Sequence, residues 1–213
     1  MFNLGYVSKI YGLWGKIPVI YNLSNLFTYL GKEKFLRERL IVQLNLKHDS
    51  SVLDVACGNG SNFVILRKYL DKLGKIYGLD YSIDMLHAAK KRSNHNLWEN
   101  IDLKQGDAAD LPYENNSFDA ALSTLGISAI PDFKSALKQV YRVLRKGGIM
   151  GILDAKLFEG NWRVFNPLIK LIYSIGASWD FTKDIIGEFS KLFREIQFEE
   201  YNGGTIYIIT GKK

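Results

Sequence analysis

Apolar residues recur along the chain in two alternating patterns, short continuous runs and longer stretches with helical spacing. The short runs predict strands, and they lie at residues 52–57, 75–80, 101–105, 118–124 and 149–154. The helically spaced stretches between them predict helices, and these lie at residues 61–73, 83–92 and 132–145. Strands that alternate with single helices are typical of right-handed crossovers and a parallel sheet. We therefore predict an α/β fold built on a doubly wound, mostly parallel sheet.

The C-terminal residues follow a different pattern. Apolar residues at 183–193 again have helical spacing, and two short apolar segments at 196–201 and 205–210 then flank Asn202-Gly203-Gly204. Two such segments joined by a glycine-rich turn are typical of a β-hairpin. The sequence thus predicts a seven-stranded sheet that ends in an antiparallel hairpin. Residues 1–48 are helical in pattern and rich in aromatic side chains, which predicts an N-terminal helical flap.

Composition and charge exclude several classes of protein. The 28 Lys and Arg against 22 Asp and Glu give a net charge of +6, but the excess lies in residues 1–50, so no broad basic face for nucleic acid is indicated. The single cysteine, Cys57, excludes a disulfide scaffold, and the three histidines have no metal-binding spacing. The N-terminus has no secretion-signal pattern, and no stretch is apolar enough to cross a bilayer. We expect a cytoplasmic protein with no metal and no nucleic-acid partner.

The clearest candidate site is a glycine-rich turn between the first predicted strand and the next helix. Gly58 and Gly60 allow backbone conformations, and a close approach of a ligand, that a Cβ would block. Asp80 ends the second predicted strand, where a doubly wound fold places a carboxylate against a ribose diol. Phe63 stands where a dinucleotide site needs a small residue, and no phosphate-loop motif is present. These residues predict an adenosyl ligand without phosphates rather than NAD or ATP.

Five segments follow one another in a characteristic order. They are Asp54…Gly58-Asn59-Gly60, Asp80-Tyr81-Ser82…Met85-Leu86, Gly106-Asp107-Ala108, Leu111-Pro112-Tyr113…Ser117-Phe118-Asp119 and Tyr141-Arg142-Val143-Leu144-Arg145-Lys146-Gly147-Gly148. In this order they resemble the class I S-adenosylmethionine-dependent methyltransferases, in particular the branch of the ubiquinone and menaquinone-biosynthesis C-methyltransferases. The resemblance covers residues 50–155. It implies a Rossmann-like fold, methyl transfer as the reaction and S-adenosylmethionine as the cofactor.

The resemblance also implies roles for individual positions. The turn residues Ala56, Gly58, Asn59 and Gly60 would line the methionine and ribose parts of the cofactor, and Asp80 would accept hydrogen bonds from both ribose hydroxyls. Tyr81 and Met85 would flank the adenine, and Asp107 and Ala108 would meet its edge. Thr124 and Leu125 would face the sulfonium and the acceptor. The remaining implied cofactor-binding residues are Tyr21 and Asn62.

The acceptor side is defined by fewer signals. Ser128 stands where family members with a Gly-Leu-Arg-Asn-Val segment carry an Arg tied to quinone chemistry. Aromatic residues outside the sheet motifs, with basic residues near them, predict an apolar pocket with a basic rim. The candidate acceptor-side residues are Tyr11, Tyr21, Ser128, Trp162 and Trp179. Such a pocket favours a small lipophilic acceptor, which could be a quinone precursor, a phospholipid amine or a thiol.

We therefore predict one methyltransferase domain over residues 1–213. Its parts are the flap at 1–48, a cofactor-binding core at 50–155, an acceptor-side insertion at 156–182, and a helix with the hairpin at 183–213. The basic and aromatic N-terminal segment is also compatible with peripheral contact to an anionic membrane. Other functions stay open at this point: a nucleic-acid or protein methyltransferase, or an adenosyl-binding module without catalysis.

Overall fold

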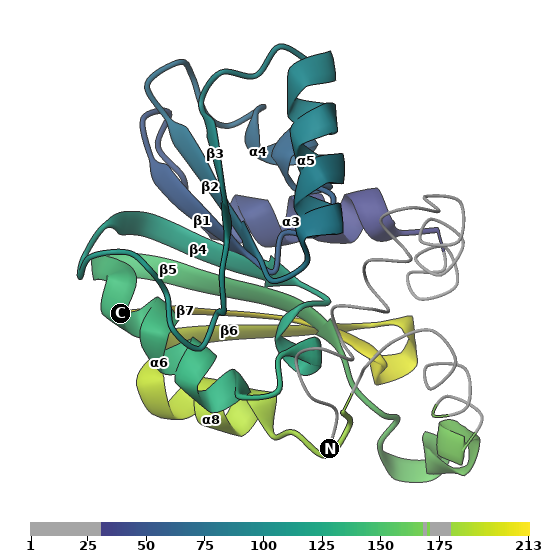
Figure 1. The fold of residues 1–213 in the computed structure, drawn as a ribbon. Coiled ribbons are helices and arrows are strands. Elements are labelled where there is room, and N and C mark those ends of the chain that lie inside the picture. The colour runs from purple at the N-terminus through teal and green to yellow at the C-terminus, as the bar shows by residue number, and fades with distance from the viewer. Residues whose placement is uncertain (1–30, 168–169, 171–179) are drawn as a thin grey trace.

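Seven strands form one sheet in the order β3-β2-β1-β4-β5-β7-β6 (Figure 1). The computed structural model describes residues 31–167, 170 and 180–213. The strands are β1 (Ser51–Val55), β2 (Lys75–Asp80), β3 (Ile101–Gln105), β4 (Phe118–Thr124), β5 (Leu144–Ala155), β6 (Arg194–Tyr201) and β7 (Ile206–Lys212). The first five pair in parallel, and β7 pairs antiparallel with both β5 and β6. The prediction of a doubly wound sheet with an antiparallel hairpin is confirmed.

Helices cover both faces of this sheet (Figure 1). The described α-helices are α3 (Glu33–Gln43), α4 (Phe63–Leu66), α5 (Ile83–His95), α6 (Phe133–Val143) and α8 (Ile185–Leu192). Short 3₁₀ turns are η1 (Ile127–Ala129), η2 (Gly160–Phe165) and η3 (Asn202–Gly204). Side chains of α3, α4 and α5 join one apolar cluster, and those of α6 and α8 join the other. The two layers are therefore α3-α4-α5 and α6-α8.

Alternation along the central strands supplies both clusters. In β1, Val52 packs into the first cluster and Leu53 into the second, and Ala120 and Ala121 of β4 divide in the same way. Successive side chains of a strand point to opposite faces, so a strand buried on both faces is apolar at nearly every position. This is why the short continuous apolar runs predicted these strands correctly.

Acidic and hydroxyl side chains cap the N-termini of three helices. Asp132 accepts a hydrogen bond from the Ser135 N–H at the start of α6, and Asp184 does so from the Gly187 N–H at the start of α8. Ser82 accepts a longer bond from the Met85 N–H at the start of α5. Such caps satisfy backbone donors that have no partner inside the helix.

The predicted helix at 61–73 is wrong in length. Only α4, four residues long, is α-helical, and beyond it Lys68 and Tyr69 donate to carbonyls three residues back. Asp71 then accepts from the N–H groups of Leu73 and Gly74, which closes a tight turn. Leu73, the last residue of the predicted helix, is 74% exposed. The apolar spacing fitted a helix, but after Leu66 the backbone bonds tighten to those of a 3₁₀ turn, and Asp71 then closes the segment.

The fifth strand begins five residues earlier than predicted, directly after α6. Its first part is held by the C-terminal residue, because Gly147 N–H donates to the Lys213 carbonyl and Lys213 N–H donates to the Gly148 carbonyl. The Lys213 Nζ also donates to the carbonyls of Leu144 and Arg142. A partner distant in the sequence thus makes a strand of Lys146-Gly147-Gly148, which lies between the predicted helix at 132–145 and the predicted strand at 149–154.

The parallel strands place their carboxyl ends along one edge of the sheet. At this edge β1 and β4 are neighbours although they are not consecutive in the chain. Ligands of open α/β sheets bind outside the carboxyl ends of the strands where the winding direction reverses. Residues 1–30, which make up most of the predicted flap, lie outside the described residues.

Candidate cofactor and acceptor site

The turn after β1 has a left-handed backbone at three alternate positions. Ala56 and Gly58 both have φ of 55°, and Gly60 has φ of 75°. A Cβ on Gly60 would come within 2.6 Å of the Phe63 ring, so this position needs glycine for space as well as for conformation. The turn therefore brings bare backbone to the end of β1, as a closely bound ligand requires.

Asp80 joins this turn to the next one. Its Oδ2 accepts a hydrogen bond of 2.8 Å from the Gly58 N–H, and its Oδ1 accepts one of 2.8 Å from the Ser82 N–H. Burial raises the pKa of Asp80 to about 6, although the N–H groups of Ser82 and Gly58 oppose the rise. Each carboxylate oxygen keeps acceptor capacity for a ribose hydroxyl, since an ionised carboxylate has about four acceptor sites.

A second left-handed residue other than glycine lies next to the turn, in addition to Ala56. Leu125, just after β4, has φ of 53° and donates its N–H to the Leu153 carbonyl at 2.7 Å. A Cβ built on the following Gly126 would lie 2.8 Å from the Ala56 Cβ, so the loops after β1 and β4 touch. Left-handed residues other than glycine are costly and gather at binding sites. Two of them meet here, between β1 and β4.

A network of buried polar side chains connects α3, β1 and β4 to the residues that follow the turn. Arg37 of α3 donates to Asn62 Oδ1 at 2.7 Å and to Thr124 Oγ1. The Asn62 amide donates to both carboxylate oxygens of Asp54, at 3.0 and 3.1 Å. Burial raises the pKa of Asp54 to about 7, with Asn62 and Arg37 opposing it. The network fixes Asn62 and Thr124, two predicted cofactor residues, against the sheet.

The other predicted cofactor residues surround the same edge. Tyr81 is partly exposed after β2, while Met85 of α5 and Ala108 are buried. Asp107 is half-buried, and its Oδ1 accepts from the Ala109 N–H at 2.8 Å. Asn59 is buried in the turn, where its Oδ1 accepts from the Ser61 hydroxyl at 2.7 Å. All of them follow β1, β2 or β3, whereas Tyr21 lies outside the described residues.

The two candidate acceptor residues that the structure describes lie in different elements, one buried and one exposed. Ser128 is buried in η1, directly after β4, and its hydroxyl donates to Asp154 at 2.7 Å. Trp162 lies in η2 and is 61% exposed, packed beside Phe158 and Phe165. Tyr11, Tyr21 and Trp179 lie outside the described residues.

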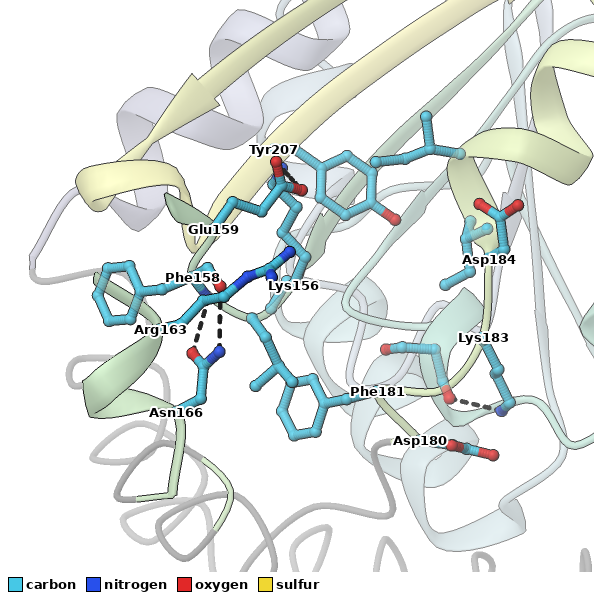
Figure 2. Close-up of a pocket in the computed structure, with 15 residues that line it drawn as sticks. Lys156, Phe158, Glu159, Arg163, Asn166, Asp180, Phe181, Lys183, Asp184 and Tyr207 are labelled. Carbon is cyan, nitrogen blue, oxygen red and sulfur yellow. Dashed lines mark hydrogen bonds and ion pairs between the residues drawn. The ribbon is translucent and has the colours of Figure 1, made fainter. Parts of the chain in front are cut away.

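A cavity of about 400 Å³ opens at the carboxyl end of β5 (Figure 2). Its walls include the apolar side chains Leu157, Phe158, Phe181, Ile185 and Ile186. Polar groups from three segments also line it: Ser128 from η1, Lys183 before α8 and Tyr207 from β7. The basic Arg163 and Lys156 agree with the predicted basic rim. The acidic residues Glu159, Asp180 and Asp184 also line the cavity, so it is less apolar than the sequence predicted. Of the two predicted acceptor-side residues that the structure describes, Ser128 lines this cavity and Trp162 does not.

The described part of the chain also bears on two other kinds of chemistry, nucleophilic catalysis by Cys57 and metal binding. Burial raises the pKa of the Cys57 thiol well above its ordinary value, which keeps it protonated and poorly nucleophilic. No three or more His, Cys, Asp or Glu side chains among residues 31–167, 170 and 180–213 gather in a way that could hold a metal ion. No helix in this described part is long and apolar enough to span a membrane.

Comparison with known proteins decides the family. The model of the ubiE/COQ5 methyltransferase family matches residues 6–202. The chain belongs to this family. It is 31% identical over 198 residues to a demethylmenaquinone methyltransferase of Lactiplantibacillus plantarum, covering 92% of this chain and 78% of that protein. It is 33% identical over 184 residues to one of Lactobacillus johnsonii, covering 86% and 70%.

Solved structures of more distant proteins share the fold. Phosphoethanolamine N-methyltransferase 2 of Haemonchus contortus, in complex with S-adenosyl-L-methionine, matches with a TM-score of 0.69 and 16% identity, over 83% of this chain and 52% of that one. The [4+2]-cyclase SpnF matches with a TM-score of 0.70 and 18% identity, over 84% and 80%. The fold alone therefore does not fix the reaction.

As a member of this family, the chain is an S-adenosylmethionine-dependent methyltransferase. The turn fits such a cofactor on its own geometry. Bare backbone at Gly58 and Gly60 permits close approach, and Asp80 offers the acceptors that a ribose diol needs. Arg37, which bonds to Asn62 and Thr124 from α3, is a residue of this candidate site that sequence reasoning missed.

Proposed function

We propose that this enzyme methylates a ring carbon of a quinone precursor. The observation that carries the proposal is the alignment, over most of the chain, with proteins named as demethylmenaquinone methyltransferases. The cavity beyond β5 supports it, since its apolar walls suit an aromatic ring and its volume falls in the usual range for small-molecule sites. The cavity opens at the same sheet edge as the glycine turn.

The residues of the chain contribute mainly by alignment. Bound S-adenosylmethionine supplies a methyl group on a positively charged sulfur. The Gly58–Gly60 turn and Asp80 hold the donor, and η1 borders both the β4 end and the cavity, so donor and acceptor would face each other across Leu125. Holding two reactants in a productive geometry is worth about 7–11 kcal/mol of the barrier.

The chemistry also sets the redox form of the acceptor. A ring carbon becomes nucleophilic when neighbouring hydroxyl oxygens donate electron density, which a hydroquinone has and an oxidised quinone lacks. Methylation replaces one ring hydrogen, and a single proton leaves in the balanced reaction. We therefore propose the reduced, dihydroxy form as the substrate.

Peripheral membrane contact is part of the same proposal. A quinone precursor with a prenyl tail resides in the bilayer, so the enzyme has to meet it there. In η2, Trp162, Val164 and Phe165 are 61%, 73% and 46% exposed, and Arg163 lies among them. Exposed aromatic and basic side chains together favour a membrane interface. This supports contact through the insertion, in addition to the N-terminal segment.

The test is a methyl-transfer assay with labelled S-adenosylmethionine and a short-chain demethylmenaquinone, kept reduced with dithionite in one arm and oxidised in the other. We expect labelled menaquinone in the reduced arm alone. Phosphatidylethanolamine, an alkyl thiol, RNA and a protein extract serve as competing acceptors. Label in one of these instead would contradict the quinone proposal, and binding of S-adenosylhomocysteine without turnover of any acceptor would favour a non-catalytic module.

A further inference from the structure

One buried hydroxyl in the cavity has no partner within the described part of the chain. Tyr207 of β7 is 1% exposed, and its hydroxyl forms no hydrogen bond to residues 31–167, 170 or 180–213. Figure 2 shows this hydroxyl directed toward the side of the cavity on which Asp184 and Lys183 lie. Buried polar groups almost always have a partner, because an unpaired one is costly, and an orphan therefore calls for an explanation. A ligand atom in the cavity would supply the missing bond.

The basic side chain of Lys183 lines the same cavity. The Lys183 Nζ donates to the Ser128 carbonyl at 2.7 Å and to the Ile130 carbonyl at 2.8 Å. An ammonium has three N–H donors, and no third hydrogen bond of this nitrogen is found within the described residues. Partial burial lowers the pKa of Lys183, while Asp180 and Asp154 favour its charge. The Nζ also lies 5.9 Å from the centroid of the Phe133 ring, a cation–π contact at the outer limit of such interactions, and this leaves the third N–H able to bond to an electron-rich oxygen.

The two groups are held in place by the sheet. Tyr207 is directly opposite Asp154 in the β5–β7 ladder, so both side chains lie on one face. Asp154 accepts from the hydroxyl and the N–H of Ser128 and thereby fixes η1. Because Ser128 in turn offers its carbonyl to Lys183, one connected set of bonds positions the cation beside the cavity.

We propose that Tyr207 and Lys183 bind a ring oxygen of the methyl acceptor, as paired hydrogen-bond donors. This inference rests on the proposed function and names the part of the site that recognises the substrate. The ring would lie against the apolar walls, with Phe181 and Ile185 among them. A hydroxyl or its anion takes both bonds, and the positive charge of Lys183 favours the anion, which pushes electron density into the ring.

The experiment compares Tyr207→Phe and Lys183→Met with two matched controls. Tyr113→Phe removes another hydroxyl without a hydrogen bond, outside the cavity lining. Lys213→Met removes another lysine whose Nζ donates to two backbone carbonyls. Measured quantities are kcat and KM for reduced short-chain demethylmenaquinone, the Kd of 2-methyl-1,4-naphthoquinone by fluorescence with S-adenosylhomocysteine present, the Kd of S-adenosylhomocysteine, and Tm.

We expect the KM to rise about fivefold in Tyr207→Phe and about thirtyfold in Lys183→Met, with the naphthoquinone Kd rising in parallel. The Kd of S-adenosylhomocysteine should stay within twofold, and the Tm of Tyr207→Phe should not fall, since no bond within the protein is lost. A KM unchanged in both variants, while the parent enzyme methylates the quinol, would overturn the inference alone. A parent enzyme that neither methylates the quinol nor binds the naphthoquinone would instead overturn the proposed function.

Discussion

Replacing Arg37 by Met tests the network beneath the cofactor turn. Arg37 is 3% exposed and bonds to Asn62, which in turn bonds to Asp54. The substitution leaves the Asp54 carboxylate buried without its nearby cation. Removing one partner of a buried charge pair costs about 3–5 kcal/mol, a large part of the 5–15 kcal/mol that stabilises a typical domain. The variant should fold, but with a markedly smaller free energy of unfolding.

The loss should depend on pH in a defined direction. The pKa of Asp54 is about 7 in the folded protein against an ordinary 3.8, so the folded state binds the proton more tightly and stability falls as pH rises between these values. Above pH 7 the free energy of unfolding of the parent protein no longer changes through Asp54. Without Arg37 the pKa rises further, so the fall continues above pH 7 by about 1.4 kcal/mol per pH unit. Below pH 6 the loss shrinks to that of neutral hydrogen bonds, about 1–3 kcal/mol.

The assay is urea unfolding of the parent and variant at pH 6, 7, 8 and 9. Arg39→Met on the same helix is the control, because Arg39 pairs with Glu199 at the surface and should show little dependence on pH in this range. In an Asp54→Asn background, Arg37→Met should lose its extra sensitivity to alkaline pH. An equal loss at all four pH values, or alkaline sensitivity that persists beside Asn at position 54, would refute the electrostatic account.

Three further predictions concern the cofactor. Asp80→Ala should raise the Kd of S-adenosylhomocysteine more than tenfold by calorimetry while circular dichroism stays unchanged, because hydrogen bonds to a charged group contribute about 1.5–3 kcal/mol each; a Kd within twofold would show that Asp80 does not hold the ribose. In the parent enzyme this Kd should rise about tenfold from pH 7 to pH 5, since Asp80, with a pKa of about 6, must lose its proton to accept both hydroxyls; a flat profile would contradict it. Gly60→Ala should lower both the Tm and the affinity for S-adenosylhomocysteine. The control is Gly31→Ala, because Gly31 has φ of 76° but nothing within 4 Å of an added Cβ, so this variant has similar backbone strain without the clash. Equal effects of the two substitutions would show that the clash with Phe63 is not the cause.

The cofactor half of the site could be predicted because its signals are local. A strand, a glycine turn and a helix follow one another between Ser51 and Leu66, and Asp80 ends the next strand. Arg37 could not be predicted in this way, because its partners lie 25 and 87 residues away and a polar residue on a helix usually faces solvent. The length of α4 was misjudged for a related reason. Apolar spacing records which side chains reach the core, but not which backbone bonds connect them.

The acceptor half is assembled from distant segments, and this bears on how the family diverges. The cavity residues Ser128, Lys183 and Tyr207 come from the segments after β4, before α8 and at the start of β7. No short stretch of sequence therefore contains a motif for the acceptor-binding groups. A change in any one of these segments alters the cavity without touching the glycine turn or Asp80. Proteins can keep one fold while their reactions differ, as the N-methyltransferase and the [4+2]-cyclase that share this fold illustrate. Substrate specificity in this enzyme should therefore follow substitutions at the β5, β7 and α8 ends, and cofactor affinity those at the β1 and β2 ends.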